Sequence, residues 1–173
     1  MFMQAIRAPK KRSYEQRMKV LECSSRGDRR FSALSAEVAV FGQRQSIENH
    51  YQLAKRFGPS IPQTLREAKG RKPTHFAVIG IPFPLAWGPA WYDLLWVKYL
   101  DQHPELVAYA HTFDAFHDAF HTARQVVCQA ESIRRYVQEG RAAILTRPDT
   151  VALLSRLASA PSDPLRYPPI DDR

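Results

Sequence analysis

The sequence predicts an α+β fold, a predominantly helical single domain with a small β-sheet. The chain has 173 residues, a length that suits one domain. Apolar residues recur at helical spacing within 46–57, 91–100 and 123–140. Residues 75–81 form an apolar run typical of a strand, and 31–41 end in strand-forming residues. Hydrophobic residues make up 45% of the chain and charged residues 24%, which is usual for a globular domain.

The sequence also indicates the cellular compartment in which the protein is expected to act. Cys23 and Cys128 lie far apart and lack metal-ligand spacing, which is typical of a reducing compartment. No segment approaches the length of a membrane span, and the N-terminus lacks the apolar core of a signal peptide. We therefore expect a cytoplasmic protein with no membrane partner. Nothing in the sequence indicates an oligomeric state.

We divide the chain into three parts. Residues 1–30 form a basic N-terminal arm with a first helix over 13–22, residues 31–159 form the main domain, and residues 160–173 form a tail rich in Pro and Asp. The arm carries nine basic residues against three acidic ones, and clustered Lys and Arg favour binding to nucleic-acid phosphates. A solvated arm that aids solubility is the alternative. The residues assigned to DNA binding are Lys10, Lys11, Arg12, Arg29 and Arg30.

The segment after the arm is expected to form a turn at 24–28 and then a short strand over 31–41. In the turn, Gly27 can supply a positive φ and Asp28 can bind nearby backbone donors. Gly42 and Gln43 then turn the chain into the next helix. This order could bring Arg26, Asp28 and Ser32 close to Glu48.

The helix expected over 46–57 has clear boundaries, with Ser46 as its N-cap and Gly58 just past its end. Ile47, Tyr51, Ala54 and Phe57 share one stripe of this helix. Glu48, Gln52 and Lys55 share a neighbouring one. Two interpretations follow. The polar stripe is a solvated Glu–Lys pair on a surface helix, or it places an acid and an amine at the rim of a pocket.

A short helix over 64–68 should end at Lys69, where a loop with Lys69 and Arg71 suits a phosphate. A strand is expected over 75–81. The proline-rich loop over 82–89 then carries Phe83 and Trp87. These aromatic side chains could stack on a base or pack onto the core.

The remaining segments are expected to be mostly helical. We expect a core helix over 91–100, a helix over 103–110 and a long helix over 123–140. Within 112–120, Phe113, Phe116 and Phe120 mark one face at helical spacing, and residues 141–159 should add a short strand and a helix. Lys98 could extend its amino group to solvent or contact a substrate. Gln129 could point into the interior, where its amide must bind backbone or ligand.

A metal site is not expected. His117 and His121 could share a helical face near His111, but no acidic or sulfur partner completes a known ligand pattern. We predict no cofactor.

The stretch Ser46-Ile-Glu-Asn-His-Tyr-Gln-Leu-Ala-Lys-Arg-Phe57 resembles the Ser/Thr-x-Glu-His-Tyr/Phe-x-x-x-Lys-Phe helix of the NADAR (YbiA-like) superfamily. Segments 30–34, 67–71, 91–100 and 103–106 resemble further pieces of that family in a compatible order. The resemblance covers roughly residues 30–120. The glycine-rich Trp-Gly-x-Gly-x-Asn-x-Leu-Gly run of the family is replaced here by Val126–Ile133, which indicates a divergent branch.

The resemblance implies an N-glycosidase, because superfamily members cleave nucleotide-like molecules and ADP-ribosylated bases. Breaking such a bond develops positive charge on the sugar and negative charge on the departing base. Glu48 is the first candidate for the carboxylate that stabilises the sugar cation, and Asp118 is the second. Lys55 is the candidate cation for the leaving base or a phosphate. A Schiff base between Lys55 and the opened sugar is a further role.

The expected substrate contacts are Arg26, Asp28, Ser32, Tyr51, Gln52, Lys69, Arg71, Trp87, Lys98 and Gln129. The basic arm and the aromatic loop favour nucleic acid as the partner, with DNA preferred and a modified or damaged base removed after flipping. Defence against phages with modified DNA is one context. The alternatives are an N-glycosidase on free nucleotides or ADP-ribosylated guanine, and a non-catalytic nucleic-acid-binding protein.

Overall fold

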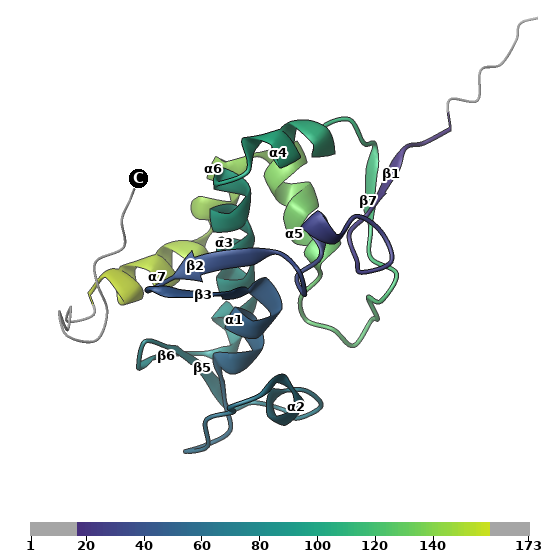
Figure 1. The fold of residues 1–173 in the computed structure, drawn as a ribbon. Coiled ribbons are helices and arrows are strands. Elements are labelled where there is room, and N and C mark those ends of the chain that lie inside the picture. The colour runs from purple at the N-terminus through teal and green to yellow at the C-terminus, as the bar shows by residue number, and fades with distance from the viewer. Residues whose placement is uncertain (1–16, 160–173) are drawn as a thin grey trace, which may run out of the picture.

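The computed structural model describes residues 17–159 (Figure 1). Its strands are β1 Val20–Glu22, β2 Glu37–Val40, β3 Gln43–Ser46, β4 Lys55–Arg56, β5 His75–Val78, β6 Ile81–Phe83 and β7 Ala115–His117. Its α-helices are α1 Ile47–Leu53, α2 Leu65–Ala68, α3 Gly88–Asp101, α4 Pro104–Ala110, α5 Gln129–Arg134, α6 Arg141–Leu145 and α7 Pro148–Ala158. Short 3-10 turns span Arg29–Phe31 and Leu85–Trp87, and a π turn spans Arg135–Glu139. The predicted α+β class is confirmed.

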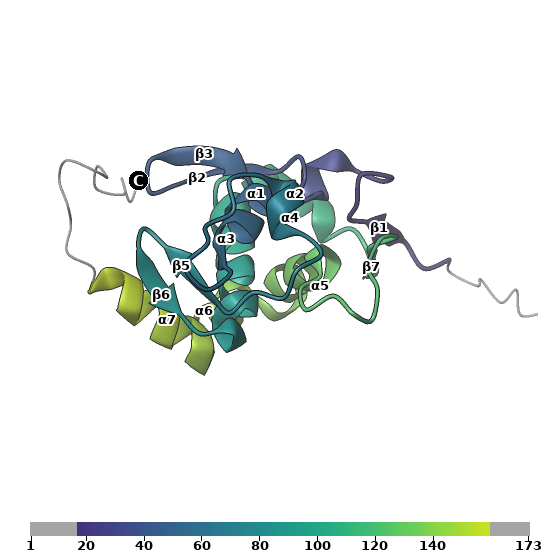
Figure 2. The same cartoon turned by 90° about the horizontal axis from the view of Figure 1, so that it is seen from below.

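Helix α3 is the centre of the core. Its buried residues lie all around its circumference, including Trp91, Leu95, Trp96 and Leu100, and such a helix is stable only when other elements cover every side. Helices α1, α4, α5, α6 and α7 and strand β2 all contact it. In Figure 2 α3 lies between the β2–β3 hairpin and α7. The core helix predicted over 91–100 is confirmed, as is the helix over 103–110.

Both segments that the sequence predicted as strands contribute to tight hairpins. Strands β2 and β3 join at Phe41 and Gly42, and β5 and β6 join at Ile79 and Gly80. All four turn residues have positive φ, from 47° to 76°, as in the primed turns that match the twist of paired strands. The strand predicted over 75–81 is wrong in extent because its hairpin turns the chain at Ile79. The strand predicted over 31–41 is also wrong in extent, because a 3-10 turn and the turns after it occupy residues 29–36 and only Glu37–Val40 are paired. The sequence did not predict these turns, because bulky residues such as Phe41 and Ile79 rarely adopt a left-handed backbone.

Two predicted helices are wrong because strand pairing replaces them. Residues 20–22 form β1, and residues 115–117 form β7, which pairs with β1 in parallel. Residues 13–16 lie outside the described part of the chain. Phe113, Phe116 and Phe120 have helical spacing but do not lie in a helix, because the pairing of β1 with β7 and the loop after β7 set the backbone conformation there. Helix α5 begins at Gln129 and not at residue 123, and no strand forms within 141–159.

The turn over 24–28 needs Gly27 for close packing and not for a positive φ. A Cβ atom at Gly27 would lie 2.2 Å from the carbonyl oxygen of Glu22. The close approach lets the turn fold back against β1, with the Asp28 N–H donating to that same oxygen at 3.3 Å. This places Glu22 where its carboxylate can hold the loop after β7.

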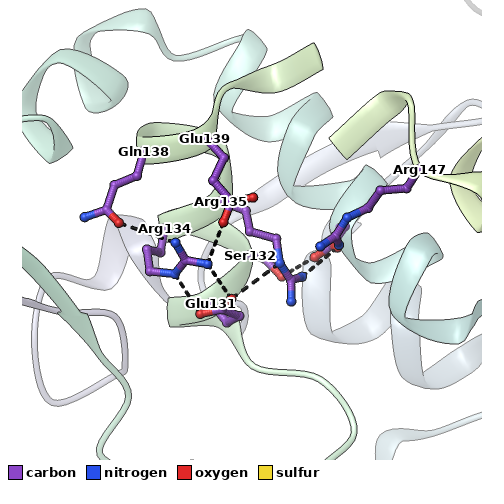
Figure 3. Close-up of polar contacts among 8 residues, drawn as sticks. Glu131, Ser132, Arg134, Arg135, Gln138, Glu139 and Arg147 are labelled. Carbon is purple, nitrogen blue, oxygen red and sulfur yellow. Dashed lines mark hydrogen bonds and ion pairs between the residues drawn. The ribbon is translucent and has the colours of Figure 1, made fainter. Parts of the chain in front are cut away.

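A buried ion-pair network joins α3 to the C-terminal helices (Figure 3). Asp93 of α3 is 3% exposed and accepts hydrogen bonds from the Ser132 hydroxyl and from the guanidinium groups of Arg135 and Arg147. A buried carboxylate requires such partners, since an unpaired one would be strongly destabilising. The network fixes α5 against α3, and α5 carries Gln129 at its first position.

Candidate active site

A cavity of about 840 Å³ opens between α1, the segment after α2, α3 and the loop from β7 to α5, which descends at the right of Figure 1. Its volume lies in the upper part of the range of small-molecule sites, about 300–1,000 Å³. Nine of the thirteen residues predicted to be catalytic or substrate-binding line it: Ser32, Glu48, Tyr51, Gln52, Lys55, Lys69, Arg71, Asp118 and Gln129.

Helix α1 supplies the carboxylate wall of the cavity. The Ser46 hydroxyl accepts a hydrogen bond from the Asn49 N–H at 3.1 Å, as expected for an N-cap. Glu48 follows in the first turn, and its N–H donates to the Ala33 carbonyl at 2.9 Å. This bond ties the start of α1 to the Ser32–Ala33 turn, so both segments face the same cavity.

The helix ends earlier than predicted. Residues 47–53 are helical and Ala54 is the C-cap, whereas Lys55 and Arg56 form β4 beside β5. The Ala77 N–H donates to the Ala54 carbonyl at 2.8 Å, which draws the chain into the sheet. Lys55 therefore enters the cavity from a strand, although the sequence placed it on the helix with Glu48.

The Glu48 carboxylate is held by two neighbours. Its Oε1 atom lies 2.9 Å from the Lys69 ammonium nitrogen and accepts a hydrogen bond from the Gln52 amide at 3.2 Å. The Glu48 side chain is 16% exposed, so it reaches the cavity without being freely solvated. The Gln52 Oε1 atom is buried and has no hydrogen-bond partner among residues 17–159. Unpaired buried acceptors are rare in proteins and suit a ligand donor.

Lys55 places an amine in the same cavity. Its Nζ atom lies 5.5 Å from the centroid of the Tyr51 ring. Burial lowers the pKa of Lys55; the negative charge of Glu48 opposes this shift, and the positive charge of Lys69 adds to it. Lysines of lowered pKa in clefts are common at functional sites.

Two tyrosines close the inner wall. Burial, with a smaller effect of the Glu48 charge, raises the pKa of Tyr51 to about 12. Burial also raises the pKa of Tyr92, which α3 contributes to the cavity. Both hydroxyls stay protonated at neutral pH and can donate hydrogen bonds. The sequence analysis missed Tyr92 because it lies within an apolar core helix.

Asp118, in the loop after β7, and Gln129, at the start of α5, also line the cavity. The Gln129 amide donates to Asp118 Oδ2 at 3.0 Å, and its Oε1 atom accepts from the Ala33 N–H at 2.7 Å. Both ends of the Gln129 side chain are thus engaged with the protein. Its geometry is that of a residue that positions Asp118 against the Ser32–Ala33 turn.

The charge around the cavity is mainly positive. Five basic residues line it against two carboxylates: Lys55, Lys69, Arg71, Lys72 and Arg124. A basic cavity of this kind suits an anionic substrate such as a nucleotide. The sequence analysis did not select Arg124, because residue 124 was assigned to a helix and belongs instead to an exposed loop.

Four predicted substrate contacts do not line the cavity. Asp28 caps the 3-10 turn and pairs with Arg30 at 2.7 Å, and the hydrogen bond from Arg30 lowers the pKa of its carboxyl group. Trp87 lies beneath the Arg156 guanidinium of α7, at 4.6 Å. Lys98 is half-buried on α3. Arg26 lies just outside, 4.8 Å from the ring of the cavity residue Phe120.

Of the predicted DNA contacts, Arg29 and Arg30 are exposed on the 3-10 turn, and Lys10, Lys11 and Arg12 lie outside the described residues. Their role in DNA binding stays a prediction.

Within residues 17–159, no cluster of three or more His, Cys, Asp or Glu side chains could hold a metal ion. His117 contacts Glu22 Oε2 at 2.6 Å. In the same range, no helix has the length and apolar character needed to cross a membrane.

Comparison with known protein families identifies the family to which the chain belongs. A family model described as DarT1-associated NADAR antitoxin matches residues 3–151, which is most of the chain and includes the region where the superfamily's glycine-rich run is absent. No curated protein matches it. The predicted resemblance to the NADAR superfamily is thereby confirmed. The chain belongs to the family of DarT1-associated NADAR antitoxins, a branch of the N-glycosidase-type NADAR superfamily.

Proposed function

We propose that this protein is an N-glycosidase that removes ADP-ribose from an ADP-ribosylated base in DNA and so reverses the modification made by a toxin. The family description as a DarT1-associated antitoxin supports a repair reaction that restores the base. Removing the base itself would leave an abasic site, which is a second lesion. We therefore favour cleavage between the base and the ribose of ADP-ribose over the DNA glycosylase reaction suggested by sequence.

The single observation that carries the proposal is the pair of Glu48 and Lys55 in one basic cavity. Glu48 presents a carboxylate oriented by Gln52 and Lys69, and Lys55 presents an amine of lowered pKa. N-glycoside cleavage needs both groups, one for the sugar and one for the base.

The reaction balances with water as the only co-substrate. The bond between ribose C1 and the base nitrogen breaks, and its electron pair leaves with the base. The Glu48 carboxylate stabilises the positive charge that develops on the ribose and takes a proton from the attacking water. The Lys55 ammonium donates a proton to the departing base nitrogen. Asp118, in the loop after β7, is the second carboxylate that could orient the water.

The basic residues of the cavity fit the rest of the substrate. ADP-ribose carries a pyrophosphate, and Lys69, Arg71, Lys72 and Arg124 line the cavity with positive charge. Lys69 would then contact both the substrate pyrophosphate and the Glu48 carboxylate. We expect the substrate pyrophosphate to draw the Lys69 ammonium partly away from Glu48, since the Lys69 side chain is half-exposed and solvent weakens its attraction to the carboxylate.

The test is Glu48→Gln, which keeps the size of the side chain and removes its charge. Free ADP-ribose released from a DNA strand with one ADP-ribosylated guanine is measured by chromatography. We expect a rate at least about 100-fold lower than for the unaltered protein, the scale of loss for a general base. Glu37→Gln, an exposed carboxylate on β2, is the matched control and should release ADP-ribose normally.

The same variant separates enzymatic neutralisation from neutralisation by binding. An antitoxin that acts by binding the toxin protein would protect cells equally well with Glu48→Gln. Protection retained by a variant that releases no ADP-ribose would contradict the proposal.

A further inference from the structure

Three large apolar side chains are exposed at the mouth of the cavity. Leu34, Phe120 and Val126 are 55%, 47% and 75% exposed, and all three line the cavity. They come from two loops, one before β2 and one between β7 and α5. Apolar side chains that gather around an opening usually mark a contact surface.

Basic side chains surround these apolar groups. The Arg26 guanidinium lies 4.8 Å from the centroid of the Phe120 ring, and Arg124 and Lys72 are exposed at the same opening. No carboxylate within the described residues pairs with any of these three cations, whereas Arg30, Arg134, Arg135, Arg141 and Arg147 all form ion pairs. Unpaired cations beside exposed aromatic and aliphatic groups are available to phosphates.

The loop that carries Phe120 and Val126 is held in place by the protein itself. Glu22 Oε1 accepts a hydrogen bond from the Ala119 N–H at 2.8 Å, and Asp118 Oδ1 accepts one from the Phe120 N–H at 3.0 Å. The Gln125 side chain accepts from the Thr122 N–H at 3.2 Å. Phe120 is therefore presented to solvent before any ligand arrives, which lowers the entropy cost of binding.

We propose that Arg26, Leu34, Phe120, Arg124 and Val126, here called the mouth surface, bind the nucleotides that flank the modified one on a single strand of nucleic acid. This inference rests on the proposed function and adds to it the surface that holds the strand on either side of the modified nucleotide. Stacking platforms combined with positive charge are the pattern by which proteins hold single strands. Bases paired in a duplex would not expose their faces to Phe120. The surface that binds the polymer thus lies beside the site.

The test compares two substrates that differ only in their flanking nucleotides. One is ADP-ribosylated guanosine monophosphate, and the other is a single strand of about nine nucleotides with the same modified base at its centre, a length typical of single-strand sites. For Phe120→Ser and for Val126→Ser we expect kcat/KM to fall about 10-fold or more on the strand and less than about 2-fold on the monophosphate. Val151→Ser, on α7 and as exposed as Phe120, should alter neither value.

Arg124 gives an independent measure that does not require turnover. The affinity for a fluorescent unmodified single strand is measured by anisotropy at several salt concentrations. Losing one phosphate contact should reduce the slope of log affinity against log salt by about 0.7 in Arg124→Gln. Arg44→Gln, a change of an exposed arginine on β3, should leave the slope unchanged.

The outcomes separate the two proposals. Equal losses on both substrates, or no loss on either, would overturn the inference, and the latter result would point to a protein partner on this surface. If the unaltered protein cleaves neither substrate but its binding to the strand depends on Arg124 and Phe120, the mouth surface stands and the proposed reaction fails.

Discussion

Lys55 shows how one residue can reduce stability and prepare chemistry at the same time. Burial lowers the pKa of its amino group, Lys69 lowers it further, and Glu48 offsets only part of that effect. An ammonium of lowered pKa gives up its proton more readily near neutral pH, as a catalytic acid should. The protein therefore keeps a charge where solvent cannot fully stabilise it.

Replacing Lys55 with methionine should make the protein more stable and inactive. Because the lysine pKa is lower in the folded protein than its ordinary value of 10.5, the folded state binds fewer protons between the two pKa values, and stability rises with pH there. At neutral pH the buried charge is a net cost. We expect a higher urea midpoint for Lys55→Met at neutral pH, with the difference shrinking as the pH approaches the ordinary lysine pKa. Release of ADP-ribose should fall at least about 100-fold.

Lys19→Met, a change of an exposed lysine near β1, serves as the control for a simple loss of positive charge. It should leave the release of ADP-ribose unchanged. A lower urea midpoint for Lys55→Met than for the unaltered protein would show that attraction to Glu48 outweighs burial.

At the scale of elements, local signals predicted only part of the structure. The Ser46 cap, the core helix and the helix beginning at Pro104 follow from residues adjacent in sequence, and the structure contains all three. The pairing of β1 with β7 and the turns at Phe41 and Ile79 depend on contacts that no local pattern reports. Glu48 and Gln52 could be grouped from helical spacing, whereas the position of Asp118 is set by strand pairing across the chain.

Gln129 links two elements of the site, and its removal should affect both. Gln129→Met keeps the size of the side chain but leaves the Ala33 N–H and the Asp118 carboxylate without this partner. We expect the free energy of unfolding to fall by about 1–3 kcal/mol, measured by urea titration. KM for the modified strand should rise because Asp118 and the Ser32–Ala33 turn lose their common anchor. Gln102→Met, at the exposed end of α3, should change neither quantity, and an unchanged KM in Gln129→Met would rule out the positioning role.

At the scale of the whole molecule, the cavity exists only because distant segments converge on α3. Its walls come from Ser25 and Tyr92 and from residues within 32–34, 48–55, 69–73 and 118–129. The Asp93 network holds α5 and the C-terminal helices against that same helix (Figure 3). The α+β class could be predicted from composition and periodicity. The shape of the cavity could not, because it depends on contacts between residues far apart in sequence.

The intact mass of the DNA product tests the central claim most directly. A single-stranded DNA with one ADP-ribosylated guanine is incubated with the protein, and the strand is weighed by mass spectrometry. We predict a strand with its guanine restored, together with free ADP-ribose. A strand that has lost the whole base would place cleavage at the deoxyribose bond and contradict the proposed repair reaction, and a strand of unchanged mass would contradict the N-glycosidase function itself.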